Sequence, residues 1–229
     1  MKNHIPNAVT CLNLFAGCLA ITQIFAGHLE TAAYLVGLAA AFDFADGLLA
    51  RALHASSPIG KDLDSLADMV SFGVVPGAIL YDLLTQAGAG TPAWLPYAGF
   101  IVTVFSALRL AKFNNDTRQT TSFIGLPTPA CTLVVASLPL ILAHDSFHIT
   151  NFILNPWVLL GLTVLLSGLL VAEIPLFALK FKNLRWQDNS VQFVFLLLAV
   201  ALLVGLQATA IPLVVLLYVL MSMMRPAVG

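Results

Sequence analysis

The chain has 229 residues, of which 59% are apolar and only 9% are charged. Soluble domains carry about 25% charged residues, so this composition argues against a water-soluble fold and favours a protein that lies in lipid. The net charge of −1 gives no sign of nucleic-acid binding. Cys11, Cys18 and Cys131 have no metal-type spacing, and we interpret them as apolar fillers.

Long apolar segments follow one another along the chain. A spanning helix needs about 20 mostly apolar residues. The run 191–224 is too long for one span, and Gln207, Ala208 and Thr209 with Pro212 predict a turn within it. We therefore expect an all-α fold, a polytopic transmembrane helical bundle. The expected spans are 7–26, 31–53, 62–86, 93–113, 127–144, 156–179, 191–206 and 209–224.

The basic residues predict the orientation of this bundle. With the N-terminus in the cytoplasm and an even number of spans, all ten Lys and Arg residues fall on the cytoplasmic side. The positive-inside rule then predicts that both termini are cytoplasmic. The residues are Lys2, Arg51, Lys61, Arg109, Lys112, Arg118, Lys180, Lys182, Arg185 and Arg225.

Four aspartates in one short window predict a metal site. Asp43 and Asp46 lie near the cytoplasmic end of the second expected span, and Asp64 and Asp68 lie at the start of the third. Each pair shares a helix face, and the turn between the spans brings the two faces together. Converging carboxylates repel one another unless a cation neutralises them, and Mg²⁺ prefers oxygen ligands. Two such ions can clamp a phosphoryl centre during displacement.

Small residues beside the aspartates indicate room for a ligand. Gly47 and Ala50 share the face of Asp43, and the following Arg51 suits a phosphate. Asp62 is out of phase with the pairs, and we interpret it as a loop or cap residue. Helix capping by the aspartates is one alternative, and a divalent-cation transporter is another. Transporter sites usually lie near the membrane midplane, whereas these carboxylates gather toward one face.

The whole window matches a known signature. It reads Asp43-x-x-Asp46-Gly47-x-x-Ala50-Arg51, then eight residues, then Gly60-x-x-x-Asp64-x-x-x-Asp68. This pattern resembles the signature of the CDP-alcohol phosphotransferase family at every fixed position. The resemblance implies a core of six transmembrane helices, usually in a homodimer. It also implies transfer of a substituted phosphate from a CDP-linked donor to an alcohol, with release of CMP.

The resemblance also implies roles for the residues of the motif. The four aspartates hold the divalent ions, Mg²⁺ or Mn²⁺ and most simply two of them, and Asp68 is also the general base. Gly47, Ala50, Arg51 and Gly60 shape the CDP pocket. The core covers residues 1–185, and residues 186–229 form an additional C-terminal transmembrane hairpin.

Three further stretches are similar to the phosphatidylserine synthase branch of this family. They imply CDP-diacylglycerol as donor, bound in part by Asn7 and Thr10, and L-serine as acceptor, bound by Arg109 and Asn114. Lys112 stands where arginine is common, which favours Arg109 as the carboxylate ligand. Glycerol 3-phosphate or inositol as acceptor and an ether-lipid donor stay open. The stretches are Pro6-Asn7-x-x-Thr10-x-x-Asn13-Leu14, Ser71-Phe72-Gly73-x-x-Pro76, and Arg109–Asn114 with Phe123-x-Gly125-Leu126-Pro127-x-Pro129.

Overall fold

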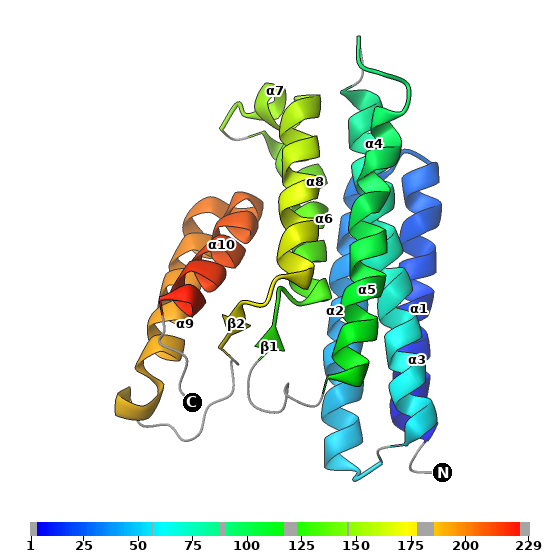
Figure 1. Ribbon diagram of the computed structural model, residues 1–229, viewed down its shortest axis with the longest axis vertical. Helices are drawn as coiled ribbons and strands as arrows, with labels where there is room; N and C mark the ends of the chain where they lie inside the picture. The colour runs from blue at the N-terminus through cyan, green and yellow to red at the C-terminus, as the bar shows by residue number, and fades with distance from the viewer. Residues whose placement is uncertain are drawn as a thin grey trace.

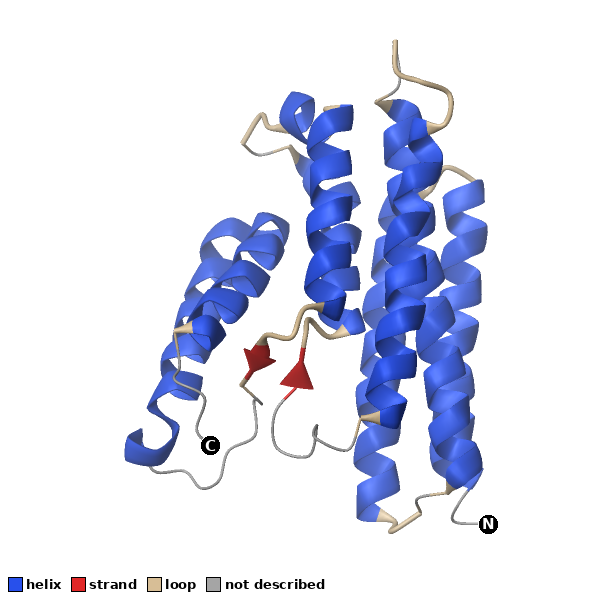
Figure 2. Cartoon of the chain, in the orientation of Figure 1, coloured by secondary structure: helices blue, strands red, loops and turns tan. Residues whose placement is uncertain are grey.

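The computed structural model is a bundle of upright helices with one short strand pair (Figures 1 and 2). It describes residues 4–55, 57–87, 90–116, 123–145, 147–177 and 186–224. The expected all-α transmembrane bundle is confirmed. Five helical segments are long and apolar enough to cross a membrane: His4–Phe25, Leu29–Ala52, Pro58–Gln86, Leu95–Asn115 and Asn189–Met223. Two shorter apolar helices are Thr128–His144 and Pro156–Val171.

The first two helices form a tight hairpin. Helices α1 (His4–Phe25) and α2 (Leu29–Ala52) are joined by a turn in which Gly27 has a positive φ of 77°. Glycine adopts this left-handed conformation without the steric cost that a side chain adds. The two helices meet through small side chains, which let helix backbones approach closely in a membrane. The buried small residues are Ala16, Gly17 and Ala20 of α1 and Ala32, Ala33 and Ala39 of α2.

The third segment is one continuous helix with a π-turn inside it. Helix α3 (Pro58–Met69) leads through the π-turn Val70–Val74 into α4 (Val75–Gln86). It begins four residues earlier than expected because Ser57 caps it, with its Oγ accepting from the Gly60 amide at 3.0 Å. Helix α4 is buried nearly throughout, whereas Ala67 is the buried residue of α3.

Neighbouring threonines hold the π-turn in place. Thr103 donates to the Gly73 carbonyl at 2.8 Å, and Thr132 donates to the Phe72 carbonyl at 2.9 Å. These threonines belong to α5 (Ile101–Asn115), which follows the 3₁₀ turn η2 (Leu95–Phe100), and to α6 (Thr128–His144). The π-turn is therefore fixed from two sides, directly after Asp68.

The expected span 156–179 is wrong at its C-terminal end. After the short α7 (Thr150–Ile153), α8 (Pro156–Val171) stops eight residues before the expected end. Ala172 is extended, and Ile174 precedes Pro175, a position at which helical backbone is disfavoured. The chain instead forms β2 (Pro175–Leu176), which pairs antiparallel with β1 (Phe123–Ile124) (Figure 2).

The described C-terminal residues form a helical hairpin. Helices α9 (Trp186–Leu206) and α10 (Ala210–Met223) lie side by side (Figure 1) and are joined by the 3₁₀ turn η3 (Gln207–Thr209). Gln207 has a positive φ of 50°, which reverses the chain within this turn. Helix α10 packs on α6 and on β2, and the turn η3 also packs on α6.

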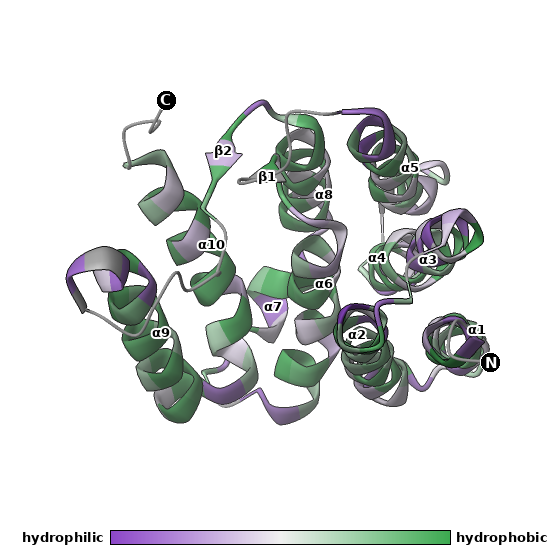
Figure 3. Ribbon diagram, turned by 90° about the horizontal axis from the view of Figure 1, so that it is seen from below, coloured by the Kyte–Doolittle hydropathy of each residue, from purple (hydrophilic) through white to green (hydrophobic). Residues whose placement is uncertain are grey.

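The surface of the bundle divides into an apolar side wall and one polar end. Exposed apolar side chains cover the helices, as expected for lipid contact. Seen from below, polar residues gather on α2, α3 and α5 (Figure 3). Arg51, Lys61, Arg109 and Lys112 belong to this end. The basic residues that lie outside the described residues are Lys2, Arg118, Lys180, Lys182, Arg185 and Arg225.

Candidate active site

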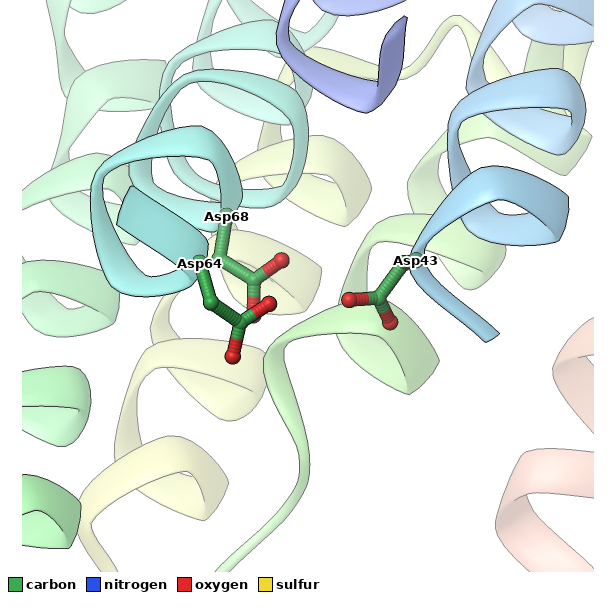
Figure 4. A group of neighbouring side chains, drawn as sticks. All are labelled: Asp43, Asp64 and Asp68. Atoms are coloured by element: carbon green, nitrogen blue, oxygen red, sulfur yellow. The ribbon is translucent and has the colours of Figure 1, made fainter. Parts of the chain in front are cut away.

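Three of the four predicted aspartates converge at the polar end of the bundle. Asp43 on α2 faces Asp64 and Asp68 on α3 (Figure 4). One carboxylate oxygen from each lies within 4.8 Å of the others, and all three side chains are half-buried. Asp43 approaches both partners within hydrogen-bonding range. Carboxylates this close need a shared cation or proton, because their charges otherwise repel.

Asp46 stands beside this cluster and is held by α1. Its Oδ2 accepts a hydrogen bond of 2.6 Å from Thr10, and its side chain is only 7% exposed. It remains close enough for charge repulsion with Asp43 and Asp64. The structure therefore brings the four aspartates to one place, but gives Asp46 a protein partner that the sequence did not assign to it.

Helix α1 supports a second aspartate as well. Asn13 is fully buried, and its Nδ2 donates to Asp68 Oδ1 at 3.5 Å. Ser71, in the π-turn, donates to the Asn13 carbonyl at 3.1 Å. Asn13 is a site residue that the sequence prediction left out. Its spacing of three from Thr10 places both side chains on one face of α1, but that spacing left a bond to another helix and contact with the cytidine equally open.

The residues predicted to shape the CDP pocket lie on α2 and α3, in the same short stretch of sequence as the aspartates. A Cβ added to Gly60 would lie 3.0 Å from Asn7 Oδ1, so these two residues meet where α1 and α3 begin. A Cβ on Gly47 would meet nothing within 4 Å among the described residues, which leaves open space beside Ala50. Arg51 is exposed, and its Nε donates to the Gly47 carbonyl at 2.9 Å.

Arg109 is the buried cation of the site. It is 7% exposed, its guanidinium carbon lies 5.4 Å from the centre of the Phe113 ring, and it is within electrostatic range of Asp68. Its Nε has no hydrogen-bond partner in the part of the chain that the structure describes. A pocket of about 40 Å³ opens beside it, lined also by Lys112, Phe113 and Glu173. A buried guanidinium with a free donor is suited to receive an anion.

Asn114 connects α5 to α3. Its Nδ2 donates to Ser65 at 2.8 Å, and its carbonyl accepts from Lys61 at 3.2 Å. Ser65 directly follows Asp64, so this contact places the end of α5 beside the aspartate cluster. Ser65 is a second supporting residue that the sequence prediction left out, since a contact between helices so distant in sequence leaves no local pattern.

The sequence profile of the CDP-alcohol phosphatidyltransferase family matches residues 3–169. The chain belongs to this family. Among curated proteins, it is 33% identical over 176 residues to the CDP-diacylglycerol–serine O-phosphatidyltransferase of Bacillus subtilis, covering 75% of this chain and 89% of that one. It is 31% identical over 210 residues to the protein of the same name from Helicobacter pylori, covering 90% and 84%. The Saccharomyces cerevisiae protein of that name is 36% identical over 155 residues, covering 60% and 54%.

The donor atoms of the cluster fit the divalent-cation dependence that is general in CDP-alcohol phosphatidyltransferases. Hard cations take carboxylate oxygens, and Mg²⁺ is usually bound by a few carboxylates together with substrate phosphates. Asp43, Asp64 and Asp68 offer three such oxygens within 4.8 Å of one another. The half-buried position of these carboxylates leaves room for ligands from a substrate.

A cavity of about 470 Å³ lies at the opposite end of this CDP-alcohol phosphatidyltransferase. Its lining includes Tyr34, His144 and Gln207, and contains none of the predicted site residues. The half-buried aspartates lie away from this cavity, at the polar end.

Proposed function

We propose that the chain transfers the phosphatidyl group of CDP-diacylglycerol to the hydroxyl of L-serine, giving phosphatidylserine and CMP. The observation that carries this proposal is the convergence of Asp43, Asp64 and Asp68 within 4.8 Å, in a chain whose curated relatives named above are all serine O-phosphatidyltransferases. The same relatives favour an enzyme over the cation transporter that the sequence alone left open.

The donor binds between α1, α2 and α3. The small residues Gly47, Ala50 and Gly60 let the cytidine diphosphate approach the backbone, while Asn7 offers hydrogen-bonding groups at the rim. Arg51 faces the solvent with its outer guanidinium nitrogens available for phosphate, since the Gly47 carbonyl accepts only from Nε. Thr10, which we expected to bind the donor, acts through Asp46 because its hydroxyl donates to that carboxylate.

The chemistry is an in-line displacement at phosphorus. The serine hydroxyl attacks the β-phosphorus of the donor, Asp68 takes the hydroxyl proton, and the bond to CMP breaks with its electron pair leaving on CMP. Such proton transfer contributes about 10²–10⁴-fold to a rate. Asp43, Asp46, Asp64 and Asp68 would hold one or two Mg²⁺ or Mn²⁺ ions, whose charge offsets that of the diphosphate. Asn13 orients Asp68 for the proton transfer through the bond to its Oδ1.

Arg109 is placed to receive the carboxylate of serine. Arg109 lines a pocket, its buried Nε has no partner among the described residues, and it lies within electrostatic range of Asp68, so one acceptor could put its carboxylate at Arg109 and its hydroxyl at Asp68. Glu173 in the same lining could hold the ammonium group. Asn114 supports this side through Ser65. Inositol offers no carboxylate, and glycerol 3-phosphate offers no cation for Glu173.

The test is an acceptor panel with the purified protein. With CDP-diacylglycerol and Mg²⁺, we expect CMP release that depends on L-serine, together with formation of phosphatidylserine. Glycerol 3-phosphate and inositol serve as the competing acceptors, and CDP-archaeol as the ether-lipid donor. Release of CMP with one of the other alcohols and not with L-serine contradicts the proposal.

We also propose that the polar end of the bundle faces the cytoplasm. All ten basic residues fall on this side by the sequence count, and the described ones, Arg51, Lys61, Arg109 and Lys112, belong to the polar end. Single cysteines in a cysteine-free background test the orientation. Labelling in intact cells should reach residue 151 and spare residue 57, and the reverse pattern contradicts the assignment.

The family resemblance supports two further proposals about organisation. Residues 1–185 form the catalytic core and 186–229 an added hairpin; the family match ends at residue 169, and residue 185 lies outside the described residues. The enzyme is a homodimer, as the resemblance implies. Cross-linking in native membranes should give a species of twice the monomer mass, and a monomer alone contradicts this.

A further inference from the structure

The acceptor side of the site is framed by the strand pair. The chain runs from α5, which carries Arg109, to β1, and from the end of α8 to β2. The Gly125 amide donates to the Ile174 carbonyl at 3.0 Å, and the Leu126 amide donates to the Leu169 carbonyl at 2.8 Å. Ile124 of β1 belongs to the lining of the Arg109 pocket. The position of the strands therefore defines one wall of this pocket.

The C-terminal hairpin forms hydrogen bonds and ring contacts with Phe177, the residue that follows β2. Tyr218 of α10 donates from its hydroxyl to the Phe177 carbonyl at 2.8 Å, and the Phe177 amide donates to Ser222 Oγ at 3.5 Å. The Phe177 ring meets Tyr218 edge-on, with ring centres 5.0 Å apart, and meets Phe195 of α9 in the same way at 5.8 Å. Both backbone groups and the side chain of Phe177 are thus held by α9 and α10.

Tyr218 also belongs to the surroundings of Arg109. The guanidinium is within electrostatic range of the Tyr218 hydroxyl as well as of Asp68. The Arg109 side chain is only 7% exposed, and its Nε has no hydrogen-bond partner among the described residues. Tyr218 is therefore linked to the pocket through Phe177 and the strand that forms its wall, and it lies within electrostatic range of Arg109.

We propose that the hairpin α9–α10 holds the acceptor side of the active site, with Tyr218 as a positioning residue that fixes Phe177 and thereby the β1–β2 wall of the Arg109 pocket. This inference rests on the proposed function for the identity of the acceptor. It gives a role to the region that lies beyond the family match, which ends at residue 169. Helix α10 packs on α6 and β2, whereas the proposed donor site lies between α1, α2 and α3. Removing a hydrogen bond between α10 and Phe177 should therefore weaken binding of the acceptor and leave binding of the donor unchanged.

The test is the steady-state kinetics of Tyr218→Phe in the purified full chain. This variant keeps the ring and removes the hydroxyl. We expect KM for L-serine to rise about three- to tenfold, which is the effect of losing one neutral hydrogen bond. We expect kcat and KM for CDP-diacylglycerol to stay within about twofold of the wild type. Tyr34→Phe is the matched control. It removes a hydroxyl that bonds to Glu30 within α2, and it should change neither the KM for L-serine nor the KM for CDP-diacylglycerol.

The kinetics of Tyr218→Phe and Ser222→Ala decide whether the hairpin positions the acceptor side. Tyr218→Phe with an unchanged acceptor KM, or with kcat and melting temperature lowered together and both KM values unchanged, overturns the inference. Ser222→Ala removes the partner of the Phe177 amide and should raise the acceptor KM in the same way; it decides the question if Tyr218→Phe does not fold. If the wild type uses another alcohol, the proposed function fails, and the hairpin is tested by the KM for that alcohol.

Discussion

The hydrogen bond from Thr10 to Asp46 offers the sharpest test of how α1 serves the metal site. Thr10→Val keeps the shape of the side chain and removes the donor of a 2.6 Å bond to a carboxylate. A hydrogen bond to a charged group contributes about 1.5–3 kcal/mol, and each 1.4 kcal/mol is about tenfold in an equilibrium. Groups that orient metal ligands typically affect metal affinity by about 10- to 100-fold. We therefore expect Mn²⁺ affinity to fall about 10- to 100-fold.

The assay is Mn²⁺ binding to the purified protein, followed by electron paramagnetic resonance, with the Mg²⁺ dependence of CMP release alongside. Thr10→Ser keeps the hydroxyl and should stay within about threefold of the wild type. Thr22→Val is the matched control, since Thr22 lies on the same helix and its hydroxyl bonds only to the Leu19 carbonyl in the described structure. A Mn²⁺ affinity within about twofold for Thr10→Val refutes the reasoning.

Asp68→Asn should abolish turnover while donor binding stays within about tenfold, and a rate above about a tenth of the wild type means that Asp68 is not the base. A chelator should remove activity and Mg²⁺ or Mn²⁺ should restore it; full activity in excess chelator rules out metal dependence. Gly17→Ala puts a Cβ 3.0 Å from the Ser71 Cα and should cost about 1–3 kcal/mol in detergent unfolding, unlike Gly37→Ala, which has open space among the described residues. Gly125→Ala, at a φ of 75° and 2.7 Å from the Leu170 carbonyl, should lower the melting temperature and raise KM for serine.

Most of the helices could be predicted because hydropathy and helix signals are local. Seven of the eight expected spans coincide closely with helical segments, and the span 156–179 differs at its C-terminal end. The turn at Gln207–Thr209 lies where polar residues interrupt the apolar run. The end of α8 was missed because residues 172–177 stay mostly apolar, and Pro175 was the one signal against a helix. The β1–β2 pair joins residues about 50 apart in sequence, and no local sequence pattern predicts such a pairing.

The candidate site was predictable to the extent that it obeys helix periodicity. The i, i+3 and i, i+4 spacings brought Asp43, Asp64 and Asp68 to one place. The partners of the aspartates were harder to assign. Thr10 and Asn13 had the right spacing, but a buried hydroxyl or amide can equally bond to another helix or to substrate, and only the packing of α1 against α2 and α3 decides between these.

The π-turn at residues 70–74 makes the site sensitive to added chain length. A π-turn takes up about one extra residue in a wider turn, so the helix on either side keeps nearly the phase that it would have without that residue. Asp64 and Asp68 therefore keep facing Asp43 while α4 stays buried in the core. Removing one residue from the turn should close it into a regular helix and leave the carboxylates facing Asp43. Inserting one further residue should instead rotate Asp64 and Asp68 by about 100° relative to α4 and abolish the reaction, although the chemistry of every side chain is unchanged.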